Sequence, residues 1–170
     1  MRSFLFKSGN YYLVLLWRLL IVWFLLFISR FVFYFLNKDL FPGIIASDWS
    51  SILYGGFVFD VAGMLYFNIL LIVLMTVPIP YKWRVSDTLQ KIVKWIFFVT
   101  NGIGLVLTCI DIIYYRFTLR RTTRSVFKEF SNEENTFSLG YRFVLDYWYV
   151  VLILILFISL MVWLYNRVKI

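Results

Sequence analysis

The chain has 170 residues, of which 62% are hydrophobic, 22% aromatic and 15% charged, with a formal net charge of +8. In soluble domains about a quarter of the residues are charged and under half are apolar. This composition therefore excludes a soluble protein and indicates an integral membrane protein. The sequence contains no histidine, which excludes an imidazole metal centre and a Ser-His or Cys-His nucleophile pair. Its cations flank apolar segments, so anionic lipid explains the charge better than nucleic acid does.

Four long apolar segments follow one another along the chain, each long enough for a helix to cross a bilayer. They cover residues 11–37, 52–77, 92–115 and 145–165, and the second stops at Pro78, which cannot continue a helix. The first is too long for the core of a signal peptide, so we expect a retained helix. The sequence therefore predicts one all-α domain, a polytopic membrane bundle of four transmembrane helices.

The segment 116–144 is the one sizeable stretch between predicted spans. Its apolar residues recur among cations at roughly helical spacing, at Leu119, Val126, Phe127 and Phe130. This pattern predicts a short helix lying in the membrane interface, between the third and fourth spans. A simpler interpretation is an amphipathic connector held by lipid phosphates.

Two spans carry a stripe of small and polar residues along one helix face. The stripes consist of Gly56, Asp60, Gly63 and Phe67 in the second span, and of Asn101, Gly104, Thr108, Asp111 and Tyr115 in the third. Small residues let helix backbones approach, so both stripes should face other helices rather than lipid. Both acids are therefore predicted to point into the bundle.

Arg30, Asp60 and Asp111 lie at similar depths when residues are counted from one end of the bundle, within roughly 6 Å at the helical rise. An unpaired charge at such depth costs at least about 2.5–3.5 kcal/mol, so pairing is favoured. The sequence predicts an ion-pair cluster of these three residues, with Arg116 as a further candidate and Asn101 in the same polar stripe. Either the cluster holds the helices together without binding a ligand, or it forms a polar pocket that receives a lipid headgroup.

Charge alone does not decide the orientation of the bundle. Four spans place both termini on one side with eight cations, against seven on the other side, so the positive-inside rule barely discriminates. Arg18 lies in the first span near the N-terminal side, where we expect its side chain to snorkel to the interface and to have no further role.

Three stretches together resemble the N-terminal membrane domain of the lipoteichoic acid synthase and sulfatase-like phosphotransferase family. They are "FDVAGMLYFN" (59–68), "IDIIYYRFTLRRTTRSVFKEFSNE" (110–133) and "RFVLDYWYV" (142–150). The most specific feature is the Tyr-Tyr-Arg-Phe run after an acid at the end of the third span. The likeness extends over about residues 11–165.

The resemblance implies a bacterial cytoplasmic membrane protein with a cytoplasmic N-terminus and five transmembrane helices. It also implies an extracytoplasmic α/β domain with a threonine nucleophile and a divalent metal, which transfers phosphoglycerol or a related headgroup from a lipid. This sequence ends shortly after the fourth span, so we expect neither catalytic residues nor a metal or other cofactor within it. Its expected function is to anchor that domain and to present lipid headgroups.

With a cytoplasmic N-terminus, the segment 116–144 is extracytoplasmic. Guanidinium groups bind phosphate bidentately, hydroxyls add hydrogen bonds, and tyrosine packs at the interface. We therefore expect a contact with anionic phospholipid headgroups through Arg116, Arg120, Arg121, Arg124, Thr122, Thr123 and Tyr115.

Two other functions are compatible with the sequence. One is a self-contained four-helix membrane protein that serves as a structural or assembly subunit. The other is a small transporter, which is less favoured because the sequence predicts neither inverted repeats nor broken helices near mid-membrane.

Overall fold

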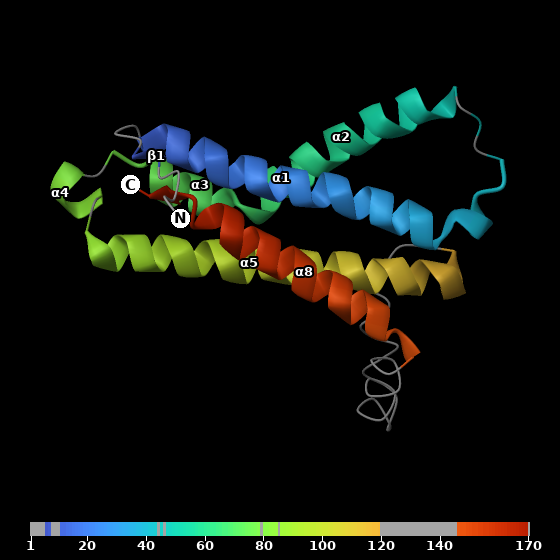
Figure 1. Cartoon of the computed structure of the whole chain (residues 1–170). Coiled ribbons are helices and arrows are strands. Elements are labelled where there is room, and N and C mark those ends of the chain that lie inside the picture. The colour runs from blue at the N-terminus through green and yellow to red at the C-terminus, as the bar shows by residue number, and fades with distance from the viewer. Residues whose placement is uncertain are drawn as a thin grey trace.

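The computed structural model describes residues 6–7, 11–43, 45, 47–78, 80–84, 86–119 and 146–169. Within these residues, four helices are long and apolar enough to cross a membrane: Tyr11–Leu36, Asp48–Phe67, Asp87–Arg116 and Trp148–Tyr165. They pack side by side as an all-helical bundle (Figure 1). The predicted fold of four transmembrane helices is confirmed. The expected interfacial helix falls mostly outside the described residues.

The first span is α1 (Tyr11–Leu36), which is followed by a short 3₁₀ turn, η1 (Lys38–Leu40). The third span is α5 (Asp87–Thr118), which is longer than predicted at both ends. Its start is stabilised by Ser86, whose hydroxyl accepts a hydrogen bond from the Leu89 N–H at 3.4 Å, with Asp87 in the first turn. Its end is marked by Leu119, which has a left-handed backbone with φ 54°. The fourth span is α8 (Trp148–Tyr165).

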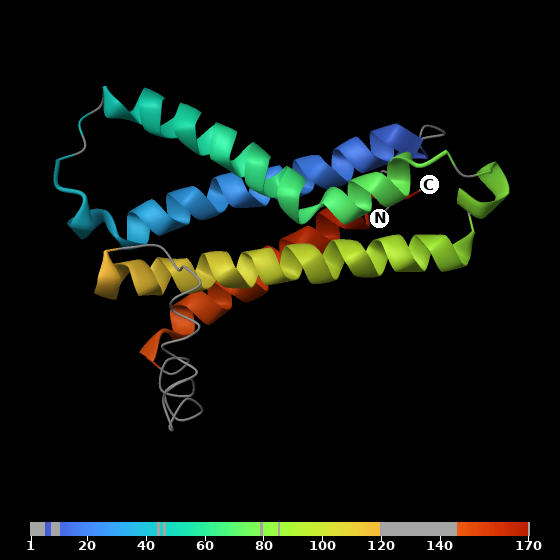
Figure 2. The same cartoon turned by 180° about the vertical axis from the view of Figure 1, so that it is seen from behind.

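The second span is broken into α2 (Asp48–Phe67) and α3 (Ile69–Thr76). The expectation of unbroken spans is therefore wrong. Asn68 separates the two helices with φ −100° and ψ 12°, and its side-chain amide donates to the Met64 carbonyl at 3.0 Å. The same carbonyl accepts the backbone N–H of Asn68, so the side chain intrudes on the helical hydrogen-bond ladder and bends the span. Figures 1 and 2 show α2 diverging from α1, whereas α3 lies beside α1 and α5.

The two ends of the chain meet at one end of the bundle. The strands β1 (Phe6–Lys7) and β2 (Val168–Lys169) pair in parallel, with Phe6 opposite Val168. The short helix α4 (Tyr81–Arg84) lies at the same end (Figure 1). This arrangement is the one expected when four spans place both termini and the central connection on one side.

Arg18 is buried in the bundle rather than directed to the interface, which corrects the expectation of snorkelling. It is 4% exposed, its guanidinium lies 4.7 Å from the centroid of the Tyr165 ring, and it donates to the Met75 Sδ at 3.3 Å. A guanidinium is favoured over an aromatic face, particularly where water is excluded. Arg18 therefore joins α1 to the end of α8 and to α3.

Candidate functional site

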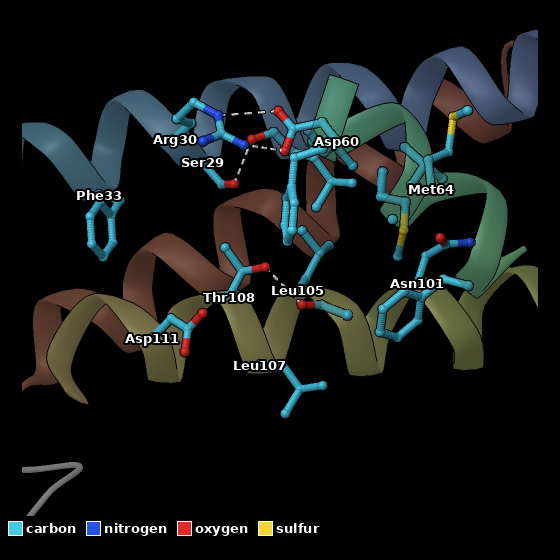
Figure 3. A pocket seen from close by; sticks show the side chains of 18 residues that line it. Ser29, Arg30, Phe33, Asp60, Met64, Asn101, Leu105, Leu107, Thr108 and Asp111 are labelled. Atoms are coloured by element: carbon cyan, nitrogen blue, oxygen red, sulfur yellow. Dashed lines mark hydrogen bonds and ion pairs between the residues drawn. The ribbon is translucent and has the colours of Figure 1, made fainter. Parts of the chain in front are cut away.

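A cavity of about 570 Å³ lies among α1, α2, α5 and α8. Most of its wall is apolar, with contributions from Leu25, Leu105 and Met161 among others. The polar side chains in the wall are Ser29, Arg30, Asp60, Asn101, Thr108 and Asp111 (Figure 3). The two predicted stripes thus face one cavity, with Asp60, Gly63 and Phe67 on one side and Asn101, Gly104, Thr108 and Asp111 on the other. The prediction that both acids point into the bundle is confirmed.

The predicted ion pair between Arg30 of α1 and Asp60 of α2 is present. The Arg30 Nη2 lies 2.6 Å from Asp60 Oδ1, and its Nε lies 3.3 Å from Oδ2, which makes the contact bidentate. The side chains are 21% and 7% exposed, respectively. A bidentate pair with so little exposure fixes the relative position of the two helices.

Gly56 provides the space that this ion pair needs. A Cβ atom at Gly56 would lie 2.6 Å from the Arg30 Nε, and the Gly56 carbonyl accepts a hydrogen bond from Arg30 Nη2 at 3.2 Å. At the neighbouring Gly55, a Cβ would have nothing within 4 Å. The stripe on the second span was predicted to face another helix because small residues let helix backbones approach. At Gly56, the small residue instead leaves space for the guanidinium of Arg30.

Asp111 faces the cavity from α5, opposite the Arg30–Asp60 pair (Figure 3). Arg116, the further candidate for the cluster, has other partners. Its guanidinium donates to the Leu36 carbonyl at 3.3 Å and lies 3.8 Å from Asp39 Oδ2. Arg116 thus joins the end of α5 to the end of α1 and to η1.

Tyr115 packs on aromatic rings rather than standing free at the interface. Its ring stacks on Phe41 with 5.5 Å between centroids and meets Phe33 edge-on at 5.1 Å. Asn37, which sequence reasoning missed, is buried beside this group and donates to the carbonyls of Phe33 and Ile112. The signal for Asn37 was an amide at the end of an apolar run.

The predicted phosphate-contact residues Arg120, Arg121, Thr122, Thr123 and Arg124 lie outside the described residues.

Asn101 lines the same cavity as Arg30 and lies at the end of it far from Asp111. It lies ten residues before Asp111, a separation of about 15 Å along the helix. Asn101 and Asn68 exchange two hydrogen bonds of 2.9 Å, and the two side chains are 4% and 1% exposed. Reciprocal amide pairing satisfies groups that would be costly to bury unpaired. Sequence periodicity indicated the face of Asn101 but not its partner.

Among the residues that the structure describes, no group of three or more Cys, Asp or Glu side chains is placed to hold a metal ion. Comparison of the chain with protein-family models, curated proteins and solved structures finds no match in any of the three. The function is therefore inferred from the cavity and its polar side chains.

Proposed function

We propose that this chain is the membrane domain of a lipid-headgroup phosphotransferase similar to lipoteichoic acid synthases, and that it binds a membrane lipid without catalysing a reaction itself. The observation that carries the proposal is the cavity among α1, α2, α5 and α8. Its apolar wall suits an acyl chain, while Arg30, Asp60 and Asp111 suit a headgroup. Its volume of about 570 Å³ falls in the usual range for small-molecule sites.

The position of the polar residues supports this proposal. Arg30 lies six residues before the end of α1, and Asp111 lies seven residues before the end of α5. The polar groups therefore sit about 10 Å from the helix ends, at a depth where a headgroup drawn inward would meet them. In the proposed orientation, the N-terminus is cytoplasmic and this end of the bundle faces the outside of a bacterial cytoplasmic membrane.

Two of the three resembling segments contribute residues to the cavity wall. The stretch 59–68 contributes Phe59, Asp60, Gly63, Met64 and Phe67, and the stretch 110–133 contributes Asp111. This coincidence supports a lipid-handling role for the residues that carry the resemblance. A self-contained assembly subunit would need no such cavity.

Filling the cavity tests the proposal. Gly63 lines it and a Cβ there meets nothing within 4 Å, so Gly63→Leu should fold and place its side chain in the cavity. We expect lipid retention, measured by native mass spectrometry after detergent extraction, to fall roughly tenfold, a loss of about 1.4 kcal/mol in binding.

Gly102→Leu is the matched control. Gly102 is also helical, and a Cβ there would also meet nothing within 4 Å, but this residue is not in the cavity wall. The substitution should leave lipid retention unchanged. Equal retention in the two variants would refute a lipid site in this cavity.

A further inference from the structure

The positive charge of the chain is concentrated in the segments that form one end of the bundle. This is the end where both termini and α4 lie, which we call the terminal end (Figure 1). The segments 1–25, 69–100 and 157–170 contain nine of the 17 lysines and arginines, but Asp87 is their single acid. The rest of the sequence contains eight cations and eight acids. The entire net charge of +8 therefore belongs to the segments of the terminal end.

Arg18 is buried at this end without a negatively charged partner. Its guanidinium contacts the ring of Tyr165 and the Met75 Sδ, and neither group carries a charge. Within the part of the chain that the structure describes, Arg18 forms no ion pair with a carboxylate. A guanidinium removed from water needs a counter-charge or strong acceptors, and a thioether sulfur is only a weak acceptor. The burial of Arg18 is therefore incompletely compensated by the residues around it.

Tyr11 supplies a second donor beside Arg18. Its side chain is 7% exposed, and its hydroxyl oxygen is buried with no hydrogen-bond partner among the described residues. Its phenol group lies close enough to Arg18 to interact with it electrostatically, and the Arg84 guanidinium lies 5.0 Å from the centroid of its ring. Buried polar groups in native proteins are nearly always paired. These three side chains thus bring two guanidinium groups and an unpaired hydroxyl together at the terminal end.

We propose that Arg18, Tyr11 and Arg84 bind a phosphate group. A phosphate carries negative charge and offers acceptor oxygens, so it supplies what the guanidinium of Arg18 and the hydroxyl of Tyr11 lack. The planar guanidinium of arginine matches the geometry of phosphate and binds it through two parallel hydrogen bonds. The phosphate comes either from the headgroup of a phospholipid or from free phosphate in solution.

The position of the cluster suits a phosphate at the level of the lipid headgroups. Tyr11 is the first residue of α1, Tyr165 is the last residue of α8, and Met75 is the last but one of α3. The partners of Arg18 therefore lie at helix ends, and a helical side chain leans toward the N-terminus of its helix, which carries the guanidinium to the same level. The three proposed phosphate ligands do not line the cavity, so this inference is independent of the proposed function.

Tyr11→Phe tests the site with the least disturbance of the fold. The variant retains the aromatic ring beside Arg84 and removes a hydroxyl that has no partner among the described residues. The free energy of unfolding without phospholipid or phosphate should therefore not change. We expect the affinity of the delipidated chain for dioleoyl phosphatidylglycerol, measured by native mass spectrometry, to fall roughly threefold. Because Tyr11 does not line the cavity, lipid held there contributes equally to both chains.

Arg18→Gln should have the larger effect, because it removes the buried charge of the site. We expect the affinity for the same lipid to fall roughly tenfold. Lys91→Gln is the matched control: Lys91 is an exposed cation of the same end, so its loss changes the net charge equally. This control should lower the affinity less than about twofold. If Arg18→Gln does not fold, Tyr11→Phe decides the outcome.

A titration with sodium phosphate at constant ionic strength identifies the source of the phosphate. The unfolding temperature of the delipidated chain is recorded, and a rise that Tyr11→Phe diminishes indicates a site open to free phosphate. A Tyr11-dependent response to the lipid alone indicates a headgroup site. If the Tyr11→Phe variant binds both probes as well as the unmodified chain does, the inference is overturned.

Discussion

Replacing Asp60 by Asn is expected to lower the free energy of unfolding by about 3 kcal/mol, because it leaves the Arg30 guanidinium in the bundle without its counter-charge. Arg30 has two hydrogen bonds to Asp60 and one to a backbone carbonyl. Neutralising the carboxylate removes the charge that offsets the desolvation of the guanidinium. Steric-trapping measurements in bicelles would give the change directly.

Removing both charges should cost less than removing one. Arg30→Gln alone leaves the Asp60 carboxylate without its counter-charge. The double variant that adds Asp60→Asn has no unpaired charge, so this variant should recover part of the lost stability. Asp39→Asn is the control, since Asp39 is 81% exposed and pairs with Arg116 at 3.8 Å. Exposed pairs contribute about 0–1 kcal/mol. Equal effects of Asp60→Asn and Asp39→Asn on the free energy of unfolding would show that the Arg30–Asp60 ion pair does not hold α1 and α2 together.

The adjacent glycines of α2 should respond in opposite directions to alanine. Alanine favours a helix over glycine by about 1 kcal/mol, so Gly55→Ala should be neutral or stabilising. Gly56→Ala brings a methyl group to within 2.6 Å of the Arg30 Nε. The guanidinium must move away from Asp60 and from the Gly56 carbonyl, and we expect a loss of about 1–2 kcal/mol despite the gain in helix propensity.

The cause of the Gly56 effect can be checked in the variant that lacks both charges. When Arg30→Gln and Asp60→Asn are combined, the side chain over Gly56 is shorter and uncharged, so the two alanine substitutions should become more alike. Unfolding free energies with and without each change give the coupling between Gly56 and Arg30. A difference that persists unchanged without the ion pair would contradict this explanation.

Much of the bundle follows from simple properties of the sequence. Span number depends on apolar length, because a helix must hold about 20 apolar residues to cross the hydrocarbon core. The faces of Asp60 and Asp111 follow from helical periodicity, which places residues three and four apart on one side. The pairing of Arg30 with Asp60 follows from depth, since a charge within the membrane requires a partner at its own level.

Other features depend on contacts that periodicity does not encode. The break at Asn68 arises because one amide bonds to its own helix and to Asn101 of α5, and no proline marks it. The burial of Arg18 requires the Tyr165 ring from the other end of the chain, 147 residues later. The pairing of Asn101 with Asn68 was not predicted for the same reason, because the partner of Asn101 was not evident from its own helix.

The most direct test of a lipid site in this cavity is photolabelling in bilayers with a lipid that carries a diazirine in its acyl chain. Thr108 and Asp111 face the cavity, whereas Val99 and Ile103 of the same helix are 47% and 54% exposed on the outside of the described bundle. A bound lipid should label the inner positions, and excess unlabelled lipid should compete this labelling away. Labelling of the outer positions should fall only in proportion to the dilution of the probe lipid. Labelling confined to the outer positions would show that the cavity holds no lipid.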